Sequence, residues 1–335
     1  MSIALEATLA VSLPEPLGKF GQMVFALVAF FAVIGIAFFI GSLTRGRAQN
    51  KVAGLIFLGP AIFLAIVGLV VPAISTFIQS FKNDTGKKFV GFSNYNWVFT
   101  NPDNRSVLIN TALWIIIAPI ASTALGLLLA LMIDRMKRES LPKSLIFMPM
   151  AISFVGASII WGLIYQYRDP SVPQVGLLSQ VAMWLGVSNP PNWLLLQPWN
   201  NFLLMVIMIW IQVGFAMVVL SAAIKAIPGE VVEAATLDGA TGFKLFRRVT
   251  VPMIRGTLVV VLTTIMIAVL KVFDIVRTMT NGNFGTQVVS NEMYAQSFVQ
   301  FDYGRGSALA VVLFVAVIPL IVYNVIQLRK ERAQS

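Results

Sequence analysis

FLLMVIMIWIQVGFAMVVLSAAI, residues 202–224, contains no charged residue, and only Trp210, Gln212 and Ser221 carry a side-chain nitrogen or oxygen. A helix needs about 20 mostly apolar residues to cross a hydrocarbon layer roughly 30 Å thick. A run of this length and composition therefore predicts a transmembrane helix. It decides the kind of fold, because a chain that contains it has to be placed in a membrane.

Further apolar runs of similar length lie on both sides of this one. They are Met23–Leu43, Ala53–Phe81, Leu108–Ile133, Ser144–Tyr165, Leu258–Val276 and Ala308–Leu328. Backbone groups in hydrocarbon must be paired within the segment, and the runs lack the alternation of a membrane strand. The sequence thus predicts an all-α integral membrane protein with about seven transmembrane helices. A shorter run, Val175–Val187, contains Gln180 and predicts an interfacial helix.

The composition agrees with a membrane protein and excludes several kinds of chemistry. Hydrophobic residues make up 58% of the 335 residues and charged residues 11%, with a mean hydropathy of +0.84, whereas an ordinary globular chain carries about 25% charged residues. His and Cys are both absent. Disulfides, Cys/His zinc sites, thiol catalysis and His-based proton relays are therefore excluded, and we expect no metal and no cofactor.

The net charge of +10 indicates orientation rather than nucleic-acid binding. Of the 24 Lys and Arg residues, 15 lie in alternate connections and in the C-terminal tail, eight lie in the other connections, and Lys271 lies within a run. Basic residues concentrate on the cytoplasmic side. The N-terminus is therefore predicted outside and the C-terminus in the cytoplasm. Glu6 and Glu15 precede the first run and its basic cluster follows it, so this run reads as an anchor and not as a cleaved signal peptide.

One cytoplasmic connection, residues 225–255, is polar but patterned. Pro228 and the acidic residues that follow it favour a helix start, and Gly239 suits the end of that helix because it adopts positive φ freely. Thr241 is placed to cap a second short helix before Pro252 introduces the next span. We expect two short helices joined by a glycine turn. They either dock a partner or pack only on their own bundle.

The chain resembles the EAA motif of ABC importer permeases in Glu233-Ala234-Ala235, then after three residues Gly239-Ala240, and then, with nine residues between Gly239 and Val249, Val249-Thr250-Val251-Pro252. Further motifs are similar to those of the MalF-like carbohydrate permeases, and two of them lean towards the α-glucoside type. The general motifs are Phe89–Tyr95 (FVGFSNY), Val272–Val276, Met279–Gly282 and Phe301–Gly304, and the two α-glucoside stretches are Leu270–Asp274 and Phe284–Gln287. The resemblance covers roughly Ala53–Lys330.

The resemblance implies a type I ABC importer permease core of six helices plus one N-terminal helix. Residues 1–52 would be the outer segment, extra helix and connection, 53–330 the permease domain and 331–335 a cytoplasmic tail. The implied location is the bacterial inner membrane. The implied partners are a second homologous permease, an ATPase dimer, an extracytoplasmic solute-binding protein and a sugar, with transport by alternating access.

The motif also implies roles for individual residues. Glu233 should meet a basic residue of the ATPase, Ala234 and Ala235 should allow close approach, and Gly239 should form the turn; Ala240 and Pro252 complete the motif. The chain lacks the G-x-x-x-x-G-K-[ST] pattern of a phosphate-binding loop. ATP hydrolysis must therefore come from another polypeptide, and the chain itself is not an enzyme.

Candidate substrate contacts follow from aligning the chain on the EAA motif. Met208, Ile211, Gln212 and Phe215 match positions that line the sugar site of the maltose permease, and span six contributes Val269 and Val272. Span six is apolar where polar and aromatic groups are expected. A purely packing role for Gln212 and Phe215 therefore stays open.

Lys271 and Asp274 lie three residues apart in span six. They form either an ion pair near the outer end of a helix or part of the sugar pathway or its outer gate. The outer connections 82–107, 166–201 and 277–307 are long enough to receive a binding protein, and the aromatic residues there fit either an interfacial belt or a docking surface.

Two other kinds of membrane protein fit the sequence less well. An ion-driven secondary transporter usually shows paired, broken helices from internal repeats and ionisable residues at the midplane, and the sequence contains no convincing repeat. A membrane enzyme would need a catalytic group of residues, and a chain without His, Cys or clustered carboxylates at membrane depth has none that the sequence reveals.

Overall fold

The computed structural model describes residues 58–169, 171–270 and 272–334, together with scattered positions between 21 and 39; near the C-terminus it describes the backbone but not every side chain. The predicted first span, Met23–Leu43, lies largely outside the described residues. The chain forms two compact units, Met1–Ser75 and Thr76–Ser335, and we describe each by itself.

From Leu58 onward the described chain forms one long helix. It runs from Leu58 to Gln79, with a π-helical stretch η1 (Ile66–Val70) followed by α4 (Val71–Gln79). Its membrane-length window is strongly apolar and none of it is buried within the chain. A helix that is apolar on every side belongs in lipid or against other membrane helices.

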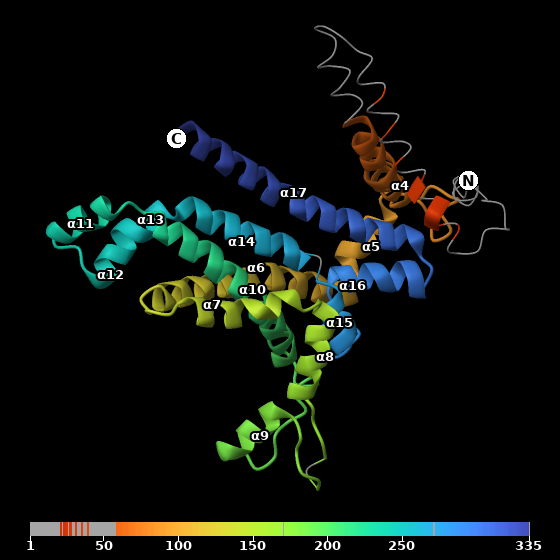
Figure 1. The fold of residues 1–335 in the computed structure, drawn as a ribbon. Coiled ribbons are helices and arrows are strands. Elements are labelled where there is room, and N and C mark those ends of the chain that lie inside the picture. Colours follow the sequence, from red (N-terminus) through yellow and green to blue (C-terminus); the bar gives the residue numbers. More distant parts are fainter. Residues whose placement is uncertain are drawn as a thin grey trace. The chain divides into compact units, whose positions relative to one another are not determined.

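Three long helices form the core of the second unit. They are α6 (Pro102–Ile133), α10 (Trp199–Lys225) and α14 (Arg255–Leu270), which pack against one another, while α17 (Tyr303–Gln334) lies along α14 (Figure 1). A Cβ added at Gly126 of α6 would lie 2.5 Å from the Cβ of Ala216, so the glycine is what lets α6 and α10 approach closely.

Two predicted spans are bent rather than straight. α7 (Ser140–Phe147) continues through the 3₁₀ turn η2 (Met148–Ala151) and meets α8 (Phe154–Ile164) at 105°. The bend lies at Ser153, which is extended and accepts a hydrogen bond from the Gly156 N–H at 3.1 Å, so it begins a new helix. The straight helix predicted for Ser144–Tyr165 is therefore wrong in shape.

The predicted span Leu258–Val276 is also interrupted. α14 ends at Leu270, and a separate short helix, α15 (Asp274–Met279), begins four residues later. At its other end α14 meets the segment Gly242–Met253 at 71°. That segment consists of α12 (Gly242–Leu245), the π-helical η3 (Phe246–Thr250) and α13 (Val251–Met253).

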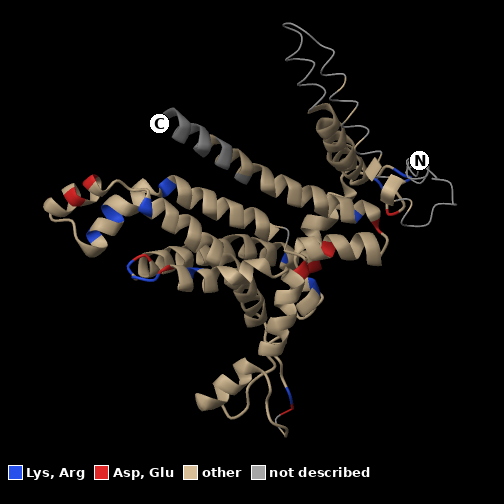
Figure 2. Cartoon of the chain, viewed as in Figure 1, with Lys and Arg blue, Asp and Glu red and all other residues tan. Residues whose placement is uncertain are grey.

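Among the described residues, four helices are long and apolar enough to span a membrane, or six if each bent pair is one span. These six correspond to the six predicted runs after residue 52. The remaining short helices are α5 (Ser93–Thr100), α9 (Leu177–Trp184), α11 (Gly229–Leu237), α16 (Val289–Tyr294) and the π-helical η4 (Ala295–Val299). α9 confirms the predicted short helix. Charged residues gather at helix ends and in connections (Figure 2).

Candidate functional site

A chain of buried side-chain amides fastens the loop after α15 to the start of α6 and α10. The Asn110 amide of α6 donates to the Gly285 and Gln287 carbonyls at 2.7 and 2.9 Å. Its carbonyl accepts the Asn201 amide of α10 at 2.8 Å, and Asn201 in turn accepts the Trp114 indole N–H at 2.8 Å. Because every bond is between neutral groups, this end of the bundle is held without buried charge.

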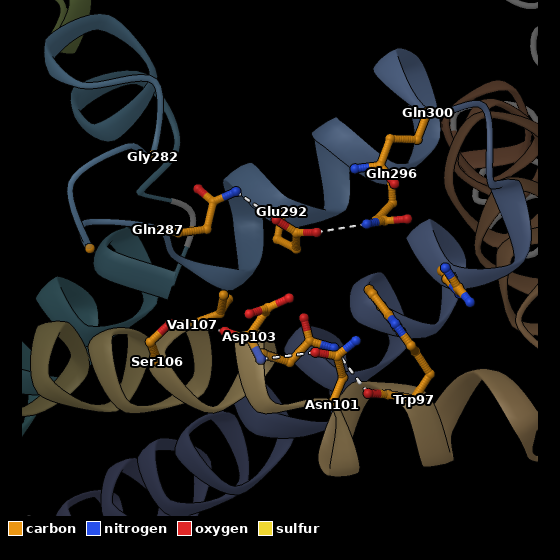
Figure 3. A pocket seen from close by; sticks show the side chains of 13 residues that line it. Trp97, Asn101, Asp103, Ser106, Val107, Gly282, Gln287, Glu292, Gln296 and Gln300 are labelled. Atoms are coloured by element: carbon orange, nitrogen blue, oxygen red, sulfur yellow. Dashed lines mark hydrogen bonds between the residues drawn. The ribbon is translucent and has the colours of Figure 1, made fainter.

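Beside this loop lies a cavity of about 500 Å³ with polar walls. Figure 3 shows Gln287, Glu292 and Gln296 along one wall and Asn101, Asp103 and Ser106 along the other. The Gln287 and Gln296 amides donate to the two Glu292 carboxylate oxygens at 2.6 and 2.7 Å. All these residues lie in connections or helix ends that the charge distribution predicts to be extracytoplasmic.

The candidate substrate residues lie in the middle of the bundle. Met208, Ile211, Val269 and Val272 are buried members of the main hydrophobic core. Phe215 packs against the same core, and Gln212 is 9% exposed. Within the single chain these residues are therefore packed against neighbours, and their contact with a sugar stays a prediction.

The proposed Lys271–Asp274 pair falls at the interruption of span six. Asp274 begins α15 and is partly exposed, whereas Lys271 lies outside the described residues. The continuous helix predicted for this stretch is interrupted, because Val272 and Phe273 are not helical and Asp274 begins a new helix. The pairing of Lys271 with Asp274 stays a prediction. A break in a helix at membrane depth exposes backbone groups that lipid cannot satisfy, so it belongs beside protein or an aqueous space.

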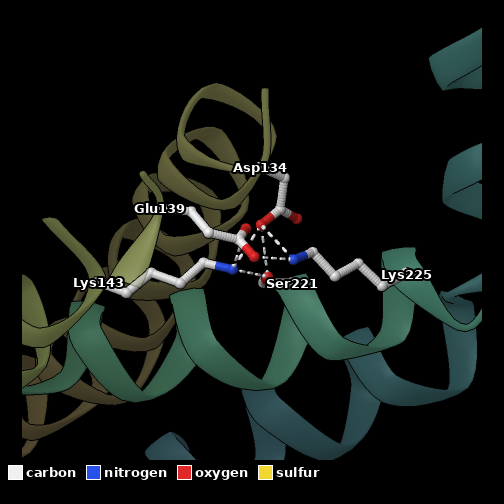
Figure 4. Close-up of polar contacts among 5 residues, drawn as sticks. All are labelled: Asp134, Glu139, Lys143, Ser221 and Lys225. Carbon is white, nitrogen blue, oxygen red and sulfur yellow. Dashed lines mark hydrogen bonds and ion pairs between the residues drawn. The ribbon is translucent and has the colours of Figure 1, made fainter. Parts of the chain in front are cut away.

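At the opposite end of α6, five side chains converge on one another (Figure 4). The Lys143 ammonium of α7 lies 2.6 Å from Asp134 Oδ1 and 2.9 Å from Glu139 Oε2. Ser221 of α10 donates to Asp134 at 2.7 Å, and Lys225, the last residue of α10, pairs with Glu139. We call these five residues the ionic cluster; it joins the α6–α7 corner to the end of α10.

The cluster is strongly charged but only partly shielded from water. Hydrogen bonds from Lys225 and Lys143 hold the pKa of Glu139 at about 2, below its ordinary value of 4.5. The Asp134 side chain is 11% exposed, and its Oδ2 has no hydrogen-bond partner among the described residues. Removing a cation here would therefore leave a carboxylate poorly compensated.

Three residues after Lys225 the patterned connection forms the predicted pair of helices. α11 ends before Gly239, whose φ is +77°, and α12 begins three residues later. Thr241 is the residue before α12, but its side chain makes no capping hydrogen bond. The glycine turn is confirmed and the predicted side-chain cap is wrong. At the turn, the Lys244 ammonium donates to the Gly239 carbonyl at 3.2 Å.

The two short helices present an apolar surface. Leu237 is 89% exposed and Phe243 is 73% exposed, and the Phe243 ring stands next to Phe246 with centroids 6.1 Å apart. Of the motif residues, Glu233, Ala234, Gly239 and Pro252 are exposed, Ala235 is partly exposed and Ala240 is buried. Large apolar side chains left this exposed indicate a surface that another molecule covers. We call residues 229–245 the coupling knob.

Sequence reasoning missed the ionic cluster and the amide chain. Lys143 and Lys225 were counted only among the basic residues that set orientation, and Ser221, which bonds Asp134, lies in a different span. The signal that could have located the cluster is the pairing of acidic residues with lysines at both ends of predicted cytoplasmic connections. The signal for the amide chain is the group of Asn residues at the outer ends of two spans.

Comparison with known proteins places this arrangement in context. Residues 122–333 match the family described as "Binding-protein-dependent transport system inner membrane component". The "Alpha-glucoside transport system permease protein AglF" of Rhizobium meliloti (strain 1021) is 46% identical over 286 residues, covering 85% of each chain. The "Osmoprotective compounds uptake permease protein GgtC" of Synechocystis sp. is 43% identical over 279 residues, covering 83% of this chain and 99% of that one.

More distant relatives share the same architecture. The "Trehalose/maltose transport system permease protein MalF" of Thermococcus litoralis is 30% identical over 271 residues, covering 79% of this chain and 90% of that one. A chain in the crystal structure of a bacterial ABC transporter involved in the import of the acidic polysaccharide alginate aligns with a TM-score of 0.71 at 22% identity, covering 85% of this chain and 99% of that chain. At that identity the structural match establishes the helical fold alone.

Proposed function

The chain belongs to the family of binding-protein-dependent transport system inner membrane components, as a permease of the carbohydrate ABC transporter type, and from this premise we propose that it carries an α-glucoside of disaccharide size or larger into the cytoplasm. It is the membrane component of such a system and not its catalytic subunit. Maltose and trehalose are the substrates to test first, because the named relatives transport α-glucosides and trehalose or maltose.

The coupling knob is the observation that carries the mechanism. It stands at the end of α10 and α14 that lies away from α5 and α16 (Figure 1), and Leu237 and Phe243 are exposed on it. We place this end in the cytoplasm, with the N-terminus outside, the C-terminus inside and residues 53–330 as the transport domain. An ATPase subunit that binds the knob would move α10 and α14 directly, since both helices begin or end beside it.

Alternating access then needs a second, homologous permease that completes the pathway. It also needs an ATPase dimer whose closure on the cytoplasmic side moves both permeases. Gln212 and Phe215 are the residues we propose at the sugar pathway, with Met208, Ile211, Val269 and Val272 as its apolar wall and Asp274 with Lys271 near its outer gate. In the single chain the apolar members are buried, so helices that carry them must separate when the pathway opens.

The test is uptake by the assembled transporter. Proteoliposomes that contain this chain, the second permease and the ATPase should take up radiolabelled maltose or trehalose only when ATP is inside with the ATPase and the binding protein is outside. Ionophores that collapse sodium and proton gradients should leave the rate unchanged. Uptake that persists without ATP and stops with the ionophores would replace the proposal by an ion-driven transporter.

A further inference from the structure

The polar cavity near the outer end of α6 is separate from the residues proposed for the sugar pathway. Its walls come from α5 and the start of α6 on one side, and from the loop after α15, α16 and η4 on the other (Figure 3). We propose that this cavity is an extracytoplasmic binding site for an uncharged saccharide of the class the transporter carries. The proposal rests on the proposed function for its ligand class, and on the following contacts for its location.

Glu292 is the central group of the cavity. Its two carboxylate oxygens accept one amide each, from Gln287 and Gln296, and it forms no ion pair among the described residues. The side-chain oxygen of Gln287, Oε1, in turn accepts the Asn291 amide at 2.6 Å. The carboxylate is therefore held in a fixed orientation by neutral donors, and each oxygen retains acceptor capacity for a further hydrogen bond.

Gln296 supplies a second, independent indication of a ligand. Its side chain is 3% exposed and lines the cavity, while its Oε1 has no hydrogen-bond partner among the described residues. A buried carbonyl without a donor is unfavourable and uncommon. Because Gln296 lines the cavity, a hydroxyl group of a ligand bound there is the donor that we propose for this oxygen.

The charged residues of the cavity wall opposite Glu292 favour a ligand without negative charge. Asp103 forms no ion pair in the described part of the chain. Arg305 pairs with Asp302 at 3.3 Å, and its guanidinium lies 4.6 Å from the centre of the Trp97 ring. The cation in the wall is therefore already engaged, and Asp103 and Glu292 are left to repel an anionic ligand.

Hydroxyl groups fit this set of partners because each donates and accepts at once. Acceptors are provided by Glu292 and Gln296, and further amides by Asn101 and Gln300. The volume of about 500 Å³ falls in the usual range for small-molecule sites, roughly 300–1,000 Å³. A neutral disaccharide therefore matches the cavity in size, in charge and in hydrogen-bonding groups.

Saturation-transfer NMR on the assembled transporter in nanodiscs, without binding protein and without ATP, tests the assignment. The probes are maltose and trehalose, and digalacturonate serves as an anionic disaccharide of similar size. The variants are Glu292→Gln and Gln296→Met, with Asn96→Ala as the matched control, because Asn96 is exposed on α5 beside Trp97 and does not line the cavity.

At least one neutral sugar should bind the wild type and the control equally and each cavity variant about tenfold more weakly, since each loses a charged or buried hydrogen-bond partner. Digalacturonate should not bind. Equal sugar binding by wild type and Glu292→Gln would overturn the proposal. So would a signal that Gln212→Leu removes and Glu292→Gln leaves, which places the sugar in the core.

The binding protein is the other candidate for this surface. If Glu292→Gln leaves sugar binding intact but weakens capture of the binding protein, the cavity is a docking surface and the proposal fails. Failure of the inference is distinguishable from failure of the proposed function. ATP-driven uptake of maltose or trehalose without any direct sugar binding would contradict only the cavity assignment, whereas absence of ATP-driven uptake contradicts the function itself.

Discussion

The two ends of α6 are fastened to α10 by different chemistry. At one end, the Asn201 amide donates to the side-chain carbonyl of Asn110, whose own amide holds the loop that precedes α16. At the other, Asp134 meets Lys143 and Ser221 in the ionic cluster. The neutral end lies beside a cavity suited to an uncharged ligand, and the ionic end lies three residues from the coupling knob. Side-chain contacts thus hold α6 to α10 at both ends. Among the described residues, ion pairs contribute to this contact only at the end proposed to lie near the ATPase.

The largest effect is expected in the coupling knob itself. Gly239 has a φ of +77°, and a Cβ added there meets nothing within 4 Å, so Gly239→Asp should leave the fold intact while straining the turn and obstructing the partner. ATP-driven uptake should fall at least about a hundredfold. Gly229→Ala is the control, since that glycine has ordinary φ and equally open space. Full uptake by well-inserted Gly239→Asp would contradict the knob's role.

The second-largest effect, a loss of stability, is expected in the ionic cluster. Lys143→Met should leave Asp134 without its closest cation and lower the free energy of unfolding by roughly 2–3 kcal/mol, a shift of several degrees in the thermal midpoint measured in detergent. Lys137→Met is the matched control, because Lys137 is exposed in the same connection and forms no ion pair among the described residues. Equal midpoints for the two variants would show that the cluster contributes little.

At the neutral end, Asn201→Leu should cost about 2 kcal/mol, because it leaves the Trp114 indole N–H and the Asn110 carbonyl buried without partners. The same thermal measurement checks this, with Asn283→Leu as an exposed control. Added salt should reduce the midpoint shift caused by Lys143→Met and leave the shift caused by Asn201→Leu unchanged, because only the former interaction is between charged groups. A salt-dependent Asn201→Leu effect would argue against the neutral description.

The smallest effect concerns the partly exposed pair Glu139–Lys225. Glu139→Gln should lower the thermal midpoint only slightly at neutral pH, because exposed ion pairs contribute little to stability. Because the folded pKa of Glu139 is lowered to about 2, the stabilisation is fully present above the ordinary pKa of 4.5 and is lost as the pH falls through about 2. The difference between wild type and variant should therefore be constant from pH 8 to pH 5. A difference that disappears between pH 7 and pH 5 would contradict this assignment.

Local patterns predicted the parts of the molecule that depend on local physics. Apolar runs located the six spans after residue 52, and Pro228 with Gly239 located α11 and its turn. The bend at Ser153 and the end of α14 at Leu270 were missed because the apolar run continues across each of them, although Ser153 caps the following helix through a local hydrogen bond. The ionic cluster and the amide chain were missed because their partners lie about 90 residues apart.

Candidate sugar contacts show the other limit of sequence reasoning. Gln212 and Phe215 were identified by alignment, and the single chain places them against packed neighbours. A pathway formed between two permeases cannot be recognised from the residues of one, because the same buried side chain serves either packing or passage until the partner helices are present.

The central claim is that the coupling knob lies in the cytoplasm and binds the ATPase, and one measurement tests it directly. The chain contains no Cys, so Leu237→Cys introduces a single reactive site at a position that is 89% exposed. A membrane-impermeant maleimide should label it in inside-out vesicles stripped of the ATPase, and re-addition of the ATPase should protect it. Labelling in right-side-out vesicles, or labelling that the ATPase does not reduce, would contradict the account.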